Sequence, residues 1–212
     1  MNHLTDPEIK KTLRLLKNYY KDTTTALNFT SPFQLLISTM LAAQSTDVRV
    51  NIVTREIFPD YPDAKSFLKL SIAELEEKIK TVGLYKSKAK NILATCKLLI
   101  ENYKGIVPKT RDELVKFPGV GRKTANVVLS IAHNFDAIAV DTHVFRVSNR
   151  IGLADAKNVE LTEEHLMKNI PKKDWSDAHH WLIWHGRKIC KARNPLCEEC
   201  FLTKYCIYFR SL

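Results

Sequence analysis

The sequence lacks the features that would assign it to several common protein classes. No apolar run in its 212 residues approaches the roughly 20 residues that a membrane-spanning helix needs. Residues 1–7 contain neither the apolar core of a secretory signal nor the Arg- and Ser-rich character of a transit peptide. Tandem repeats, low-complexity segments and long linkers are also missing. We therefore expect a globular, cytoplasmic protein with no membrane partner.

Strand signals are nearly absent as well. The one strand-like run, residues 137–140, has no second run with which to pair, so we interpret it as a buried connector. Helical signals recur along the chain: Thr5 with Glu8 and Ser71 with Glu74 form capping boxes, and residues 89–103 carry the clearest apolar stripe. The sequence predicts an all-α fold. Further helices are expected over residues 32–41, 111–117, 123–133, 158–170 and 175–189.

Negative charge is in deficit. The chain has 33 Lys and Arg against 23 Asp and Glu, which gives a formal net charge of +10. A basic surface on an intracellular protein most often binds nucleic acid, although a merely soluble basic protein can share this composition. Hydrophobic residues make up 45% of the chain, enough for a sizeable core in one large domain or two small ones.

The chain has five cysteines, and four of them lie close together near the C-terminus. Cys190, Cys197, Cys200 and Cys206 follow the pattern C-x6-C-x2-C-x5-C. Because no secretory signal suggests an oxidising compartment, a metal centre is favoured over disulfides. Zinc sites usually separate two cysteine pairs by about a dozen residues, whereas a compact asymmetric loop is typical of an iron–sulfur cluster. We therefore predict a [4Fe-4S] cluster, with zinc or free thiols as alternatives, and interpret Cys96 as a core residue.

A second pattern, FPGVGRKTA, covers residues 117–125. Pro118 should end the preceding helix, Gly119 and Gly121 permit a tight turn, and Lys123 begins the next helix. Such a helix-hairpin-helix points backbone N–H groups outward, where they can bind a phosphate whatever base it carries. On a basic, all-α chain with a four-cysteine loop, this pattern indicates DNA binding.

Several longer motifs carry a resemblance to a known family. They are PGVGRKTANVV, AVDTHVFRVSNR, HHWLIWHGRKIC with the cysteines after it, LAAQSTD at residues 41–47 and VGLY at residues 82–85. In these motifs the chain resembles the endonuclease III family of DNA glycosylases, over essentially its whole length. The resemblance implies a helix-hairpin-helix glycosylase fold with a six-helix barrel over residues 25–135. It implies that residues 1–24 and 136–212 form a cluster domain, with DNA in the cleft between the two.

The resemblance also implies an activity. The family performs base-excision repair as bifunctional DNA N-glycosylases with AP lyase activity on double-stranded DNA that carries a damaged base, usually an oxidised pyrimidine, or an abasic site. We expect a monomer associated with the nucleoid. Two alternatives stay open: a mismatch-specific glycosylase without lyase activity, and a non-catalytic iron–sulfur DNA-binding module.

Two residues carry the implied chemistry. Lys123 is the lysine that distinguishes bifunctional members, because a neutral amine can attack the sugar C1′, expel the base and form a Schiff base. Asp141 of the V-D-T-H motif can stabilise positive charge on the sugar and assist proton transfer, although its simpler role is that of a helix N-cap. We interpret His143 as a structural residue.

The remaining implied residues contact DNA. Gln44 resembles the family's gap-filling residue, which hydrogen-bonds the base left without a partner, and Leu84 resembles its apolar wedge. Gly119, Val120, Gly121 and Arg122 of the hairpin should contact phosphates. Lys191 and Arg193, between the first two cluster ligands, should form a basic ridge along the DNA backbone once the cluster orders this loop.

Overall fold

The computed structural model describes residues 3–133 and 138–212. Every regular element of these residues is helical, which confirms the all-α prediction, and none of the described helices is long and apolar enough to cross a membrane. The chain divides into two compact units. Residues 26–135 form the barrel unit, and residues 1–25 together with 136–212 form the cluster unit.

Short polar side chains begin the helices where the sequence predicts capping boxes. The amide of Thr5 donates to the Glu8 carboxylate at 3.0 Å, and α1 (Asp6–Tyr19) starts there. Ser71 and Glu74 cap α5 (Ile72–Ile79) in the same reciprocal way. These contacts satisfy backbone N–H groups that have no partner within the helix, so they fix where each helix starts.

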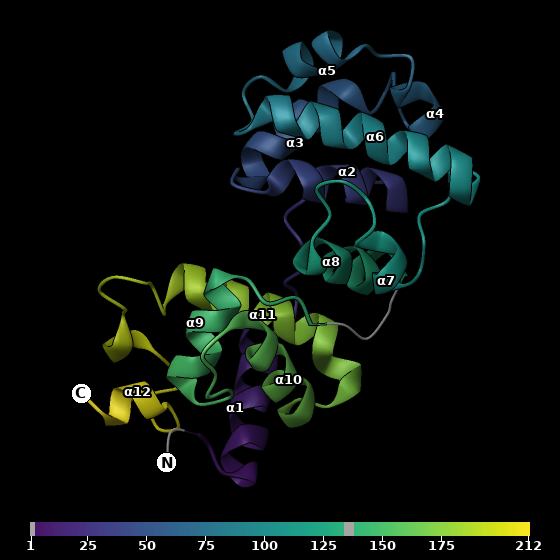
Figure 1. The fold of residues 1–212 in the computed structure, drawn as a ribbon. Helices are drawn as coiled ribbons and strands as arrows, with labels where there is room; N and C mark the ends of the chain where they lie inside the picture. The colour runs from purple at the N-terminus through teal and green to yellow at the C-terminus, as the bar shows by residue number, and fades with distance from the viewer. Residues whose placement is uncertain (1–2, 134–137) are drawn as a thin grey trace. The chain divides into compact units, whose positions relative to one another are not determined.

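The barrel unit is built around α2 (Pro32–Ala42), which packs against α3 (Asp47–Ile57), α6 (Tyr85–Tyr103) and α8 (Arg122–His133) (Figure 1). The long helix α6 also packs against α5 and the single-turn helix α4 (Ala64–Phe67). The single-turn helix α7 (Arg111–Leu114) packs against α8. The apolar stripe predicted over residues 89–103 faces the interior, and its buried members are Ala89, Ile92, Cys96 and Leu99.

Cys96 has the core position that the sequence predicts. Its side chain is fully buried among the apolar residues of the barrel core, and this burial raises the pKa of its thiol to about 12. The thiol is therefore protonated at neutral pH and acts as a small apolar group.

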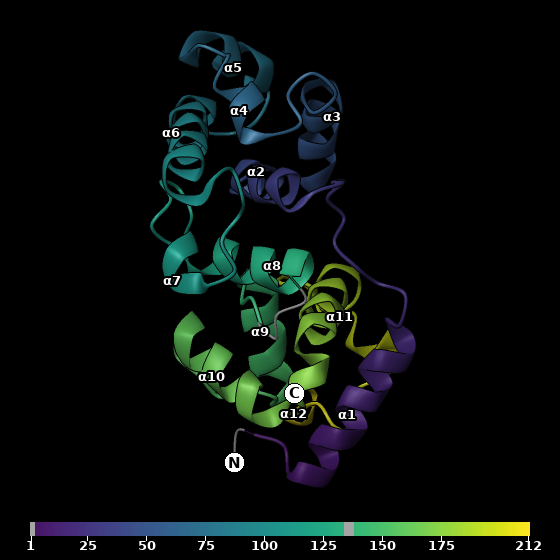
Figure 2. The ribbon, with the colours of Figure 1, turned by 90° about the vertical axis from the view of Figure 1, so that its right-hand side faces the viewer.

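The cluster unit has a core of its own. Helix α11 (Trp175–Lys188) packs against α1 and α9 (Thr142–Ile151), and α9 also contacts α10 (Val159–Asn169) and α12 (Ile207–Arg210) (Figure 2). Two short 3-10 helices, η1 (Lys172–Asp174) and η2 (Cys197–Glu199), complete the described elements.

Gly186 explains why α9 and α11 pack so closely. A Cβ atom at this position would lie 3.0 Å from side-chain atoms of His143, Arg146 and Val147 on α9. The absence of a side chain at Gly186 therefore lets the two helices approach.

The strand-like run leads into α9. Its first residue, Ala137, lies outside the described residues. Ile138, Ala139 and Val140 have no regular secondary structure and are at most 3% exposed. This described part is a buried connector, as the sequence predicts.

Candidate functional site

The helix-hairpin-helix is present, with one difference from the prediction. The helix expected over residues 111–117 ends at Leu114, so its predicted length is wrong. The amides of Lys116 and Phe117 donate to carbonyls three residues earlier, which tightens the chain into turns. Pro118 disfavours helical backbone at Phe117, so the helix does not continue after these turns.

The two hairpin glycines have different roles. Gly119 has φ +78°, and a Cβ atom there would lie 2.7 Å from Nδ2 of Asn91, so this position requires glycine. Gly121 has no positive φ, and a Cβ there would meet no atom within 4 Å. The sequence predicted that both glycines permit the tight turn, and a Cβ clash that glycine avoids exists only at Gly119. Val120 is only 4% exposed and packs into the barrel core, and its amide donates to the Phe117 carbonyl at 3.0 Å within the turn.

Lys123 is exposed at the second position of α8. The helix begins where the amide of Ala125 donates to the Gly121 carbonyl at 3.0 Å. Its buried face, which includes Ala125 and Val128, anchors it in the barrel core. Because this buried face fixes the helix, the exposed Arg122 and Lys123 have a fixed position at its start. They lie next to backbone N–H groups that have no acceptor within the helix.

Gln44 and Leu84 lie in two loops of the barrel unit that the structure brings together. Both side chains are exposed, and both residues have left-handed backbone, with φ of 55° and 59°. This conformation costs a non-glycine residue about 1 to 3 kcal/mol. The loops are joined by the amide of Gly83, which donates to Oγ of Ser45 at 3.0 Å. Strained backbone of this kind is typical of residues at functional sites, where the surrounding fold stabilises it.

Asp141 lies at the N-terminus of α9 in the cluster unit. Its carboxylate accepts a hydrogen bond from the amide of Val144 at 2.7 Å, so the simpler of its two predicted roles, the helix N-cap, is confirmed. His143 is half-buried, with Nδ1 3.2 Å from the guanidinium of Arg146, and burial lowers the pKa of its imidazole. These contacts agree with a structural role for His143.

The four clustered cysteines line one cavity in the cluster unit, together with apolar side chains such as Ile151 and Leu196. None of the described cysteines is in a disulfide. Burial raises the pKa of the Cys200 thiol to about 11, and it also raises the pKa values of Cys197 and Cys206. Ligation must therefore displace protons that these thiols hold at neutral pH. Four soft sulfur donors around one apolar hollow fit an iron–sulfur cluster, which is ligated by thiolates.

Polar groups around the cavity reach the sulfur atoms. The amide of Leu202 donates to Sγ of Cys200 at 3.4 Å, and Nε2 of His185 lies 3.6 Å from the same sulfur. Nδ1 of His185 lies 3.1 Å from the hydroxyl of Tyr20. Contacts of this kind orient ligands and tune a bound metal centre.

Two arginines of α9 hold the backbone of the cysteine loop, and sequence reasoning did not single them out. Arg146 donates to the carbonyls of Gly186 and Cys190 at 3.0 to 3.1 Å. Arg150 donates to the carbonyls of Lys191 and Ala192 at 2.7 and 3.1 Å. Their i, i+4 spacing within the FRVSNR motif was the only available signal, because it places both on one face of the helix.

Lys191 and Arg193 are exposed on the loop between the first two cysteines. The carbonyl of Lys191 accepts a hydrogen bond from Arg150, so the backbone of this basic segment is anchored while its side chains face solvent. The arrangement leaves both cations available to an anionic partner.

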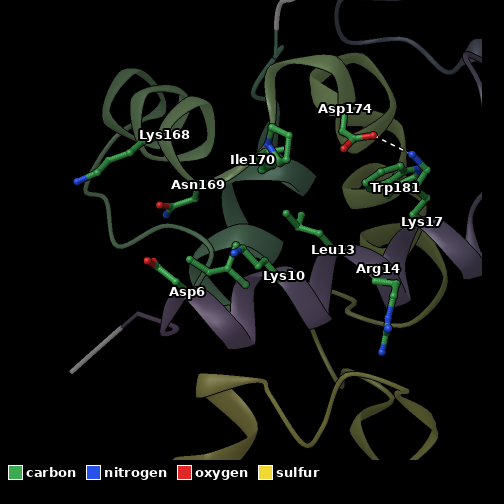
Figure 3. Close-up of a pocket in the computed structure, with 12 residues that line it drawn as sticks. Asp6, Lys10, Leu13, Arg14, Lys17, Lys168, Asn169, Ile170, Asp174 and Trp181 are labelled. Atoms are coloured by element: carbon green, nitrogen blue, oxygen red, sulfur yellow. Dashed lines mark hydrogen bonds and ion pairs between the residues drawn. The ribbon is translucent and has the colours of Figure 1, made fainter.

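A separate pocket of about 530 Å³ lies in the cluster unit and contains none of the predicted site residues. Helix α1 forms one wall with Lys10, Leu13 and Arg14, and the salt bridge between Lys17 and Asp174, 2.8 Å long, closes one end (Figure 3).

The fold and these sites define a helix-hairpin-helix protein with a thiolate-ligated iron–sulfur loop. Residues 37–172 match the model of the HhH-GPD superfamily of base excision DNA repair proteins, and residues 190–206 match the iron–sulfur binding domain of endonuclease III. The chain is 51% identical to endonuclease III of Escherichia coli K12 over 185 residues, which cover 87% of this chain and 88% of that protein. It is 50% identical over 187 residues to endonuclease III of Rickettsia felis, covering 88% of both chains.

Solved structures agree with these relatives. A trapped covalent intermediate of endonuclease III with DNA matches with a TM-score of 0.93 and 45% identity over 98% of both chains. A thermostable thymine-DNA glycosylase matches with a TM-score of 0.86 and 25% identity, covering 98% of this chain and 99% of that one. The chain belongs to the endonuclease III family. It is a DNA-binding base-excision repair enzyme, a DNA glycosylase with AP lyase activity, and its cofactor is a [4Fe-4S] cluster.

Proposed function

We propose that Lys123 is the nucleophile of this glycosylase and lyase. Its amine attacks C1′ of the damaged nucleotide, the bond from C1′ to the base breaks, and the base leaves. The bond from C1′ to the ring oxygen O4′ then breaks, which opens the sugar and gives a Schiff base. The Schiff base acidifies the C2′ proton, and loss of that proton expels the 3′ phosphate, which cuts the strand on the 3′ side of the lesion. The supporting observation is the exposed position of Lys123 at the start of α8. It comes directly after the hairpin turn, which requires glycine at position 119.

We propose that Asp141 supplies the negative charge for the same reaction. A carboxylate can stabilise the positive charge that develops on the sugar and can assist proton transfer. The N-cap contact to Val144 uses one carboxylate oxygen, Oδ1, and fixes the orientation of the group. A fixed carboxylate needs no reorganisation when charge develops, which is the condition for electrostatic catalysis.

The remaining DNA contacts follow from the exposed groups. Gly121 meets no protein atom within 4 Å at its Cβ position, so a phosphate can approach the backbone there and at Arg122. Lys191 and Arg193 add cations along the DNA backbone. Gln44 enters the space that the extruded base leaves, and Leu84 wedges the stack open.

We further propose that the substrates are oxidised pyrimidines and abasic sites in duplex DNA. We also propose that the enzyme acts as a monomer on cytoplasmic, nucleoid DNA. A mismatch glycosylase without lyase activity, or a DNA-binding module without catalysis, would not need an amine at position 123.

Borohydride trapping on DNA with an abasic site tests the nucleophile, because reduction makes a transient Schiff base permanent. We expect the parent enzyme to be trapped and Lys123→Gln to lose both trapping and strand cleavage while it still binds DNA. Lys116→Gln, which makes the same change at an exposed lysine before the hairpin, is the matched control and should be trapped normally. Full trapping of the Lys123→Gln protein would show that another amine is the nucleophile and would contradict the proposal.

A further inference from the structure

One lysine of the barrel unit is buried beneath the loops that carry Gln44 and Leu84. Lys88 lies on the first turn of α6 and is only 6% exposed, and burial lowers the pKa of its amine. A lysine is almost never this buried unless its charge is paired or hydrogen-bonded. The contacts of the Lys88 amine therefore indicate its structural role.

The Lys88 amine binds the segment that contains Gln44. Its Nζ donates to the carbonyl of Leu41 at 2.8 Å and to that of Ala43 at 2.5 Å, and it lies 3.4 Å from Oγ of Ser45. Leu41 is in the last turn of α2, where carbonyls lack partners within the helix and a cation is favoured. The lysine thus fixes the backbone just before the left-handed Gln44 and contacts the side chain of Ser45 just after it.

The same network continues into the loop that carries Leu84. Oγ of Ser45 accepts the amide of Gly83 at 3.0 Å, and the amide of Lys88 donates to the Leu84 carbonyl at 3.0 Å. A Cβ atom at Gly83 would lie 2.9 Å from the Gln44 carbonyl oxygen, so the two loops are in close contact there. Lys88 therefore holds one loop through its side chain and the other through its backbone.

We propose that Lys88, acting through Ser45, is a positioning residue that fixes Gln44 and Leu84 in one arrangement, so that both can enter DNA together when a base is extruded. The proposal rests on the gap-filling and wedging roles proposed above for these two side chains. Because Gln44 and Leu84 are already fixed before DNA binds, their ordering costs less free energy on binding. This gain applies only where a base can leave the stack, so it favours damaged DNA over intact duplex.

The measurement is a ratio of two dissociation constants, for undamaged duplex and for the same duplex with a tetrahydrofuran abasic analogue, which supports no chemistry. We expect Lys88→Met to lower this ratio about tenfold while affinity for undamaged duplex stays within about twofold. Ser45→Ala and Gly83→Ala should lower it in the same direction. Lys90→Met, which removes an exposed charge from the same helix, should leave the ratio unchanged.

Thermal unfolding of each variant separates positioning from simple stability. A Lys88→Met protein that melts earlier but keeps the parent ratio would show a structural role only and would overturn the proposal. If Lys88→Met does not fold, Ser45→Ala decides, because it removes one hydroxyl and leaves the buried charge in place. An unchanged ratio in folded Ser45→Ala would then overturn the proposal.

Gln44→Ala and Leu84→Ala distinguish failure of the positioning role of Lys88 from failure of the proposed gap-filling and wedging roles. If both retain the parent ratio, neither side chain fills the gap, and the proposal falls with that role. If both lower the ratio while Lys88→Met and Ser45→Ala do not, the gap-filling role stands and the positioning role of Lys88 is wrong. We expect Lys88→Met to have a smaller effect in a Gln44→Ala background than alone, because coupled residues are not additive.

Discussion

The barrel unit and the cysteine loop of the cluster unit are stabilised in different ways. The barrel has a continuous apolar core in which Leu36, Ile92 and Leu99 are fully buried. Among residues 190–212, Leu202 is the only buried hydrophobic side chain. The loop is held instead by arginine contacts to its carbonyls, and it places four thiols around one cavity. Apolar burial stabilises the barrel, whereas the loop depends on ligation.

The largest expected effect comes from removing one cluster ligand. Cys197→Ser should lose the iron, because three thiolates and a hydroxyl cannot replace four thiolates, and about four irons per chain should be measured only in the parent protein. Amide exchange of residues 190–206 should become fast, while that of α6 stays protected.

Cys96→Ser is the matched control for this change, since it makes the same substitution in the barrel core. It buries a hydroxyl among apolar side chains, so it should destabilise the barrel and leave the iron content intact. Unfolding of both units together in the Cys197→Ser protein would contradict the difference between them.

The converse test weakens the barrel core. Leu99→Ala removes a fully buried side chain from α6 and should lower the free energy of unfolding of the barrel by about 2 to 5 kcal/mol. Urea unfolding measures the loss, and iron content should not change. Leu68→Ala, at a residue that is 41% exposed, should have a much smaller effect. A Leu99→Ala protein that lost its iron would show that the loop also depends on the barrel.

Asp141 has a structural and a chemical role that two substitutions can separate. Asparagine is as good an N-cap as aspartate, so Asp141→Asn should leave stability nearly unchanged but slow base excision by roughly 10²-fold. Asp141→Ala should show the same slow chemistry and also lose about 0.5 to 2 kcal/mol of stability with the cap. Single-turnover excision rates and urea unfolding measure the two effects. If the Asp141→Asn protein excised bases at the parent rate, Asp141 would have only its structural role as the helix N-cap.

The smallest expected effect concerns the contact between α1 and the segment after the cysteine loop. The Thr5 amide, followed by Arg210, lowers the pKa of Glu8 from its ordinary 4.5 to about 2. A depressed carboxyl pKa means that the unfolded chain binds the proton more readily. The stabilisation is therefore complete above about 4.5 and is lost as the pH falls toward about 2.

Glu8→Gln should remove this pH dependence, and amide exchange of the first turn of α1 should report it. The ion pair to Arg210, 2.6 Å long, lies at the surface, where such pairs contribute little. Glu164→Gln, at an exposed glutamate of α10, should leave the pH dependence as it is. An ordinary titration midpoint for Glu8 would contradict the assignment.

The features that the sequence predicted are those set by local pattern. Capping boxes located helix starts at Thr5 and Ser71 because the reciprocal contacts span only three residues. Cysteine spacing predicted the cluster because the ligands lie in one short loop. Buried Cys96 was evident from its place in an apolar stripe.

The features that the sequence did not predict depend on distant contacts. Lys88, Arg146 and Arg150 resemble surface charges in sequence, and only the fold shows that they bind carbonyls of other segments. The early end of the helix at Leu114 is an exception, because it depends on turn hydrogen bonds between residues three apart that the helical pattern did not reveal. The different demands on Gly119 and Gly121 likewise appear only when Asn91 is seen against the hairpin.

The central claim is that the amine of Lys123 forms the covalent bond to DNA, and peptide mapping of the borohydride-reduced complex tests it most directly. After digestion of the parent enzyme and its DNA, mass spectrometry should find the reduced sugar adduct on Lys123, in the peptide that covers the start of α8. An adduct on any other lysine or on the N-terminal amine, with Lys123 unmodified, would contradict the account.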